Sequence, residues 1–114
     1  MSFEIERKNE AILVRLNVSR LDANTSRELR SKIENHSIKL DDRVVLDFEG
    51  VEFIDSSGLG ALVNLMKHLG KTGEMILCSV HSKPIMDILN LTHMIKYFNI
   101  KDNAEEALAA FQSA

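Results

Sequence analysis

The stretch Phe53-Ile54-Asp55-Ser56-Ser57-Gly58-Leu59-Gly60 decides how this chain is organised. It joins an apolar run at 44–48 to an amphipathic run at 59–69. Aspartate and serine favour helix N-caps, so the stretch predicts a loop that opens a helix. A helix N-terminus presents unpaired N–H groups and the positive end of the helix dipole. It therefore favours an anion such as a phosphate.

Two interpretations of this stretch are open from its residue types. In the first, the adjacent hydroxyls of Ser56 and Ser57 form a phosphorylatable switch beside the helix N-terminus. In the second, the stretch is an ordinary capped helix start, because serine is common at caps.

The residues before this stretch carry periodic patterns that predict secondary structure. Alternation with period two is typical of a half-buried strand, and a nearly all-apolar, β-branched run is typical of a strand buried on both faces. The first pattern predicts an antiparallel hairpin of strands 3–7 and 11–16 with a turn at 8–10. A polar connector follows at 17–24, and then a helix over 25–36 capped by Asp22 or Asn24. The last pattern predicts a buried strand over 44–48.

The residues after it predict further alternation of strands and helices. The patterns predict a helix that ends at Gly70, followed by a buried strand over 74–80. The next helix begins at Ser82 and Pro84 and ends near Thr92. A short edge strand within 95–100 and a last helix capped at Asp102 and Asn103 complete the order. The predicted class is α/β: an antiparallel hairpin followed by β-α units, with a mixed, mostly parallel sheet of four to five strands and about four helices. One domain spanning 1–114 is the expected organisation.

The composition argues against several classes of function. Of 114 residues, 45% are apolar and 27% charged, and the net charge is 14 − 17 = −3. A nucleic-acid binder usually has a basic surface and stacking aromatic residues, whereas this chain has no Trp and 5% aromatic residues. We therefore expect no direct contact with nucleic acid.

The sequence also indicates a cytoplasmic setting. One cysteine, Cys78, cannot form an internal disulfide, which fits a reducing compartment. No apolar run approaches the roughly 20 residues of a membrane helix, and the N-terminus lacks the pattern of a signal peptide.

The sequence lacks the constellations that enzymes and metal sites need. The four histidines have no short metal-ligand spacing, so we expect no metal, and Cys78 is expected to be a small core residue. A serine nucleophile would need a base, and the Gly-x-Ser-x-Gly elbow is absent. Gly58 and Gly60 lack the third glycine of a dinucleotide fingerprint, which leaves a nucleotide or small-ligand sensor as a weak hypothesis.

Two carboxylates each have a structural and a functional interpretation. Asp47 ends an apolar strand, where it either bonds local backbone or supports the loop at 55–57. Asp22 is either a helix cap, which the sequence favours, or a surface contact near the serine motif.

The order of elements and three stretches resemble the STAS domain, specifically the stand-alone bacterial anti-sigma factor antagonists. The strongest match runs from Val44 through Phe48 and Asp55-Ser56-Ser57-Gly58-Leu59-Gly60. Gly73 to Cys78 is similar to the next strand of the family, and Leu21-Asp22-Ala23-Asn24-Thr25 looks like its Leu-Asp-x-x-Thr stretch. The family commonly has glycine where this chain has Ser19.

The resemblance implies a regulatory protein with no catalytic activity of its own and no cofactor. In such proteins the first serine after the aspartate, Ser56 here, is phosphorylated by a partner that is both a serine kinase and an anti-sigma factor. The unmodified antagonist binds the kinase, the phosphorylated form is released, and a metal-dependent serine phosphatase resets the switch.

The implied partner surface consists of residues at the two predicted helix starts: Asp22, Thr25, Asp55, Ser57, Gly58 and Leu59. Because both hydroxyls lie within one residue of the cap, Ser57 stays an alternative acceptor. The output of the kinase also stays open. It is a sigma factor or, alternatively, secretion, biofilm formation or a signalling enzyme.

Overall fold

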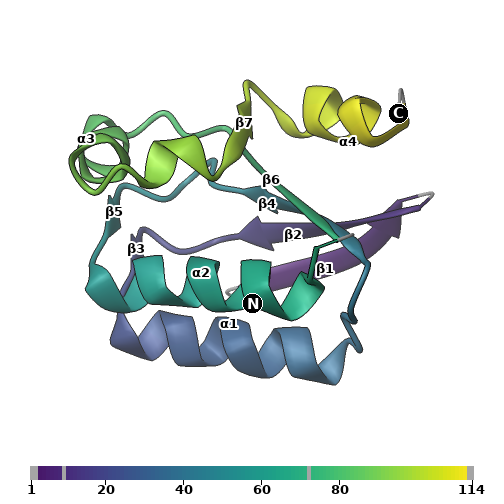
Figure 1. Cartoon of the computed structure of the whole chain (residues 1–114). Coiled ribbons are helices and arrows are strands. Elements are labelled where there is room, and N and C mark those ends of the chain that lie inside the picture. The colour runs from purple at the N-terminus through teal and green to yellow at the C-terminus, as the bar shows by residue number, and fades with distance from the viewer. Residues whose placement is uncertain (1–2, 9, 72, 113–114) are drawn as a thin grey trace.

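A five-stranded mixed sheet forms the centre of the fold in the computed structural model, which describes residues 3–8, 10–71 and 73–112 (Figure 1). Its strand order is β1-β2-β4-β6-β7, with β1 antiparallel to β2 and the remaining pairs parallel. The strands are β1 (Phe3–Lys8), β2 (Ala11–Leu16), β4 (Arg43–Asp47), β6 (Glu74–Cys78) and β7 (Asn99–Lys101). The predicted hairpin and mostly parallel sheet are confirmed. The predicted turn at 8–10 includes Asn9, which lies outside the described residues.

Side chains of the central strands are buried on both faces of this sheet. On one face, Val14, Val44 and Leu46 belong to the larger core cluster. On the other face, Leu13 and Val45 belong to a smaller cluster. Continuous apolar runs are therefore explained by burial on two sides, as expected for parallel strands between helices.

In the described part of the chain, four α-helices cover the two faces: α1 (Ala23–Asn35), α2 (Ser56–Leu69), α3 (Lys83–Leu91) and α4 (Ala104–Gln112). Helices α1 and α2 lie side by side along one face, and α4 lies across the other (Figure 1). Leu29 of α1 and Leu62 of α2 pack into the larger cluster, whereas Ala107 and Phe111 of α4 pack into the smaller one. None of the described helices is long and apolar enough to cross a bilayer.

A second, two-stranded sheet was not predicted from the sequence. Strand β3 (Arg20–Leu21) pairs in parallel with β5 (Phe53–Ile54). The carbonyl of Ser19 accepts hydrogen bonds from the N–H groups of Glu52 and Phe53, at 2.8 and 3.2 Å. The segment predicted as a polar connector therefore contains a strand. This strand has only two residues, which are too few to show a periodic pattern.

Several predicted boundaries were wrong. Helix α1 begins at Ala23 and not at residue 25, because Asp22 is its cap. Strand β6 ends at Cys78, because Ser79 has a φ of 57° and leaves the extended region. The edge strand predicted within 95–100 is present as β7, but it begins only at Asn99, because a 3₁₀ turn, η1 (Met94–Lys96), occupies the first part of that range.

Candidate functional site

The predicted serines occupy the first two positions of α2. Asp55 is the N-cap, and its Oδ1 accepts hydrogen bonds from the N–H groups of Ser57 and Gly58, at 2.8 and 3.1 Å. The side chains of Ser56 and Ser57 are exposed, and neither hydroxyl bonds to a residue that the structure describes. The helix start is therefore capped, as the second interpretation of this stretch required, but the cap is Asp55 and not a serine. Both hydroxyls are therefore available for other chemistry.

Gly58 and Leu59 have mainly structural surroundings. Gly58 is buried, and a Cβ at this position would collide with the backbone oxygen of Leu21 and lie 2.7 Å from Cγ1 of Ile54. Only a residue without a side chain lets α2 approach β3 this closely. Leu59 is half-buried and packs against the larger core cluster. The glycine thus fixes where the exposed serines lie.

Asp22 and Thr25 form a reciprocal cap at the start of α1. The Oδ1 atom of Asp22 accepts from the N–H groups of Asn24 and Thr25, both at 3.1 Å. In return, the N–H of Asp22 donates to Oγ1 of Thr25 at 2.8 Å. The backbone N–H of Thr25 lowers the pKa of the Asp22 carboxyl, more than desolvation raises it, and the charge of Arg20 contributes in the same direction. The cap interpretation of Asp22 is confirmed.

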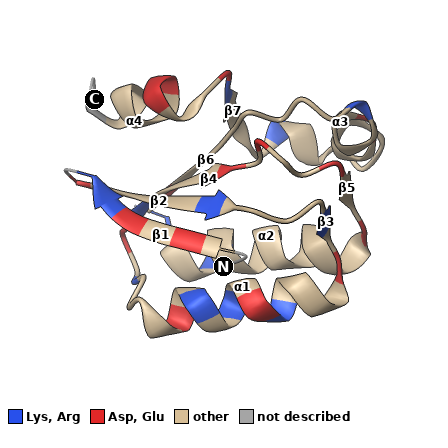
Figure 2. Cartoon of the chain, turned by 180° about the vertical axis from the view of Figure 1, so that it is seen from behind, with Lys and Arg blue, Asp and Glu red and all other residues tan. Residues whose placement is uncertain are grey.

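The small β3–β5 sheet brings these two helix starts together. Leu21 pairs with Ile54, so Asp22 and Asp55 follow at neighbouring positions, and the N–H of Asp55 donates to the Leu21 carbonyl at 3.3 Å. Figure 2 shows acidic residues at both strand-to-helix junctions, at the same end of the molecule. Apart from the buried Gly58, the predicted site residues at the starts of α1 and α2 therefore lie on one surface.

Sequence reasoning missed one residue at this surface, Arg20. Its guanidinium carbon lies 4.5 Å from the centre of the Phe53 ring, in cation–π geometry. A signal was present, because Arg20-Leu21-Asp22 repeats the pattern of Phe53-Ile54-Asp55: an outward residue, a buried aliphatic residue and a capping aspartate.

The other polar residues singled out from the sequence have local structural contacts. Asp47 Oδ1 accepts from the N–H of Glu49 at 3.1 Å, which favours its structural interpretation. Ser82 caps α3, and its hydroxyl donates to the Glu52 carbonyl at 2.6 Å, tying α3 to the loop before β5. Cys78 is buried, which raises the pKa of its thiol to about 12. Among the described residues, no three His, Cys, Asp or Glu side chains are grouped to hold a metal ion.

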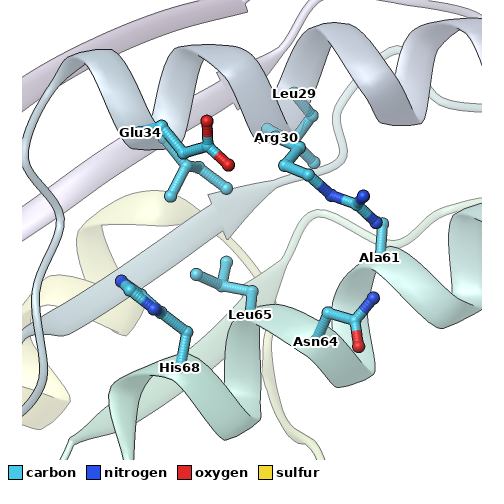
Figure 3. Close-up of a pocket in the computed structure, with 8 residues that line it drawn as sticks. Leu29, Arg30, Glu34, Ala61, Asn64, Leu65 and His68 are labelled. Carbon is cyan, nitrogen blue, oxygen red and sulfur yellow. The ribbon is translucent and has the colours of Figure 1, made fainter.

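A groove of about 280 Å³ lies between α1 and α2 (Figure 3), and neither Ser56 nor Ser57 belongs to its lining. Its apolar lining comes from Leu29, Ile33, Ala61 and Leu65, and its polar lining from Arg30, Glu34, Asn64 and His68. The ring Nε2 of His68 lies 2.7 Å from the Ile38 carbonyl, which fixes the ring. A ligand-sensing hypothesis therefore has a candidate location along the helices, distinct from the loop at Gly58 and Gly60 that the sequence pointed to.

Comparisons with known proteins agree with this architecture. The family model that matches is that of the STAS domain, over residues 2–107. The anti-sigma F factor antagonist of Paenibacillus polymyxa is 30% identical over 114 residues, covering 98% of this chain and 96% of that protein.

Solved structures share the fold over nearly the whole chain. An anti-sigma-factor antagonist (STAS) domain protein from Planctomyces limnophilus has a TM-score of 0.82 at 25% identity, with 95% of each chain covered. The unphosphorylated form of the anti-sigma factor antagonist SpoIIAA has a TM-score of 0.78 at 23% identity, covering 98% of this chain and 97% of that one. The phosphorylated form of Bacillus SpoIIAA has a TM-score of 0.69 at 23% identity, covering 96% and 98%.

Proposed function

The chain belongs to the STAS domain family and, within it, to the anti-sigma factor antagonists, and from this premise we propose that it is a phosphorylation-switched binding protein. In its unmodified form it binds a serine kinase that is also an anti-sigma factor, and phosphorylation of Ser56 releases it. A metal-dependent serine phosphatase removes the phosphate. The chain acts in the cytoplasm as a single STAS domain and has no catalytic activity of its own.

The observation that carries this proposal is the position of Ser56. Its hydroxyl is exposed at the first residue of α2 and is not used to cap the helix, because Asp55 does this. A kinase can therefore modify it without breaking a hydrogen bond on which the described fold depends. The positive end of the α2 dipole favours the added anion, so the modification needs no refolding.

The switch follows from the charge that phosphorylation adds. A phosphate brings roughly −1.5 to −2 charges at neutral pH. It would lie beside the capping carboxylate of Asp55 and on the same surface as Asp22. A partner that packs closely here would have to bury a hydrated dianion or leave a gap. Since about 1.4 kcal/mol changes affinity tenfold, even a part of that cost releases the partner.

The other proposed contacts flank this hydroxyl. Asp22 and Thr25 belong to the start of α1, and Asp55, Ser57 and Leu59 to the start of α2. Gly58 is buried, so its contribution to partner binding is to hold α2 against β3. The family pattern favours Ser56 as the acceptor over the neighbouring Ser57.

The proposal is tested first by mapping phosphate on the protein isolated from its own cells, by intact-mass and peptide mass spectrometry. One phosphate on Ser56 is the expected result. Phosphate on Ser57 alone would move the site, and no phosphate under any growth condition would contradict the switch.

Binding to the kinase then tests the role of the modification. We expect Ser56→Ala to bind like the unmodified chain and to resist phosphorylation, and Ser56→Asp to bind at least tenfold more weakly. Ser31→Ala is the matched control, since it removes an exposed hydroxyl from α1 outside the proposed partner surface, and should bind and be phosphorylated normally. Equal binding by Ser56→Asp and Ser56→Ala would contradict the proposal.

The groove between α1 and α2 favours a second candidate, a sensor of small ligands. Its apolar lining, from Leu29, Ile33 and Leu65, would bury an apolar part of a ligand beneath the charged side chains of Arg30 and Glu34. Saturable binding of a nucleotide or metabolite that perturbs the NMR signals of these residues would support this candidate. Perturbations of NMR signals confined to α2 near Gly58 and Gly60 would instead place the ligand at the start of this helix, beside the serines.

A further inference from the structure

Building on the proposed function, we propose that Arg20 is the internal counterion of the phosphate carried by Ser56. In the unmodified chain the guanidinium lies over Phe53. In the phosphorylated chain it pairs with the phosphate across the end of the β3–β5 sheet. The modification would therefore change the partner surface twice, by adding an anion and by engaging the cation beside it.

The register of the small sheet places Arg20 within reach of Ser56. Arg20 pairs with Phe53, and its side chain already crosses to β5, where the guanidinium carbon lies 4.5 Å from the ring centre. Ser56 follows Phe53 by three residues, which span roughly 10 Å at most in extended chain. Strand alternation puts Arg20 on the same face as Asp22, since both lie one residue from the buried Leu21.

The backbone that carries Arg20 is held on both sides. The Thr25 hydroxyl, which Asp22 N–H also contacts, lies 2.8 Å from the Arg20 carbonyl and can donate to it. On the other side, the Ser19 carbonyl is bonded to the loop before β5. A cation on a fixed backbone, stacked on an aromatic ring, loses little conformational freedom when it pairs with an anion.

The guanidinium N–H groups of Arg20 are also available for a new hydrogen bond. Its guanidinium donates no hydrogen bond to any described residue, and its charge acts on Asp22 only through space. Two other cations, on α1 and α3, have partners already: Arg27 bonds to Oδ1 of Asn24, and Lys83 pairs with Asp87 at 2.9 Å. A bidentate arginine–phosphate pair is among the stronger charge-assisted contacts.

The charges around the phosphate have opposing effects. The carboxylates of Asp22 and Asp55 disfavour the dianion, whereas Arg20 and the positive end of the α2 dipole favour it. If Arg20 pairs with the phosphate, removing its charge raises the second pKa of the phosphoserine. For an exposed pair the expected rise is roughly 0.3 to 0.7 unit.

The test uses the full chain with phosphoserine installed genetically at position 56, so that no kinase is needed. The second ionisation of the phosphate is followed by phosphorus NMR in the otherwise wild-type chain and in Arg20→Ala. We expect the higher pKa in Arg20→Ala, an intermediate value in Arg20→Lys, and no change in Arg7→Ala, which removes an exposed arginine from β1. Equal titration of the otherwise wild-type chain and Arg20→Ala would overturn the proposal, as would an equal shift in Arg7→Ala.

A second measurement does not depend on the folding of any variant. In the phosphorylated chain with Arg20 intact, the side-chain N–H signal of Arg20 should shift along the titration curve of the phosphate, and its invariance would count against the pair. Absence of phosphate on Ser56 in cells would contradict the proposed function and leave this contact measurable. The two failures are therefore distinguishable.

Discussion

At the residue scale, the serine motif combines one residue that must be small with two that must be accessible. The collision of a Cβ on Gly58 with the Leu21 carbonyl explains the first requirement. The capping role of Asp55 explains the second, because it leaves Ser56 and Ser57 without a structural task in the described fold. The sequence identified these residues but could not say which of the three polar side chains was the cap, since all three are capping types.

Two glycines of α2 provide a matched test of this packing. We expect Gly58→Ala to lower the free energy of unfolding by about 1–3 kcal/mol, because the methyl group must push α2 away from β3. Gly60→Ala meets nothing within 4 Å and should raise it by roughly 0.5–1 kcal/mol, since alanine is the better helix former. Urea denaturation measures both. Equal effects of the two substitutions would show that the close approach to Leu21 does not constrain the fold.

At the element scale, each of the two helices that carry the proposed partner surface starts directly after a strand of the small sheet. Asp22 follows β3 and caps α1, and Asp55 follows β5 and caps α2. Since β3 and β5 are paired, the two caps are held at neighbouring positions. The starts of α1 and α2 therefore act as one surface only while this pairing persists.

The cap of α1 should make stability depend on pH. The pKa of Asp22 is below its ordinary value of 3.8 in the folded chain, so its contribution to stability is fully present above about 3.8 and is lost as the pH falls through the lower, folded pKa. Asp22→Asn keeps a capping side chain that does not titrate. We expect wild type to lose more stability than Asp22→Asn when the pH is lowered from 5 to 2.5, as measured by chemical denaturation. Parallel losses would mean that the Asp22 carboxylate has no such role.

At the scale of the whole molecule, the central sheet separates two regions of different character. Helices α1 and α2 cover one face, and their N-termini carry the proposed switch. Helix α4 covers the other face, where Cys78, Val45 and Phe111 pack together. The second region serves the stability of the sheet.

Cys78 should therefore report global unfolding. Its thiol is buried and its pKa is about 12, so almost no thiolate exists at pH 8 and the native chain should resist alkylation. We expect iodoacetamide to label the native protein only as fast as the chain opens, and to label the denaturant-unfolded chain at the rate of a free cysteine. Rapid labelling of the native chain would show that the α4 side of the sheet opens locally.

The sequence by itself determined the order and type of nearly all elements, because each carries a local signal. The helices around Leu29 and Leu62 show helical spacing, the central strands are continuous apolar runs, and Asp22, Ser82 and Asn103 are capping types before apolar stripes. These signals act between residues a few positions apart, so they can be read along the chain.

Only the tertiary structure decided how the site is assembled. Strands β3 and β5 have two residues each, too few for a periodic pattern, and their pairing depends on α2 lying against Leu21 at Gly58. The stacking of Arg20 on Phe53 and the adjacency of Asp22 and Asp55 follow from that pairing. Contacts between segments distant in sequence are selected by packing of the whole chain, so no local pattern records them.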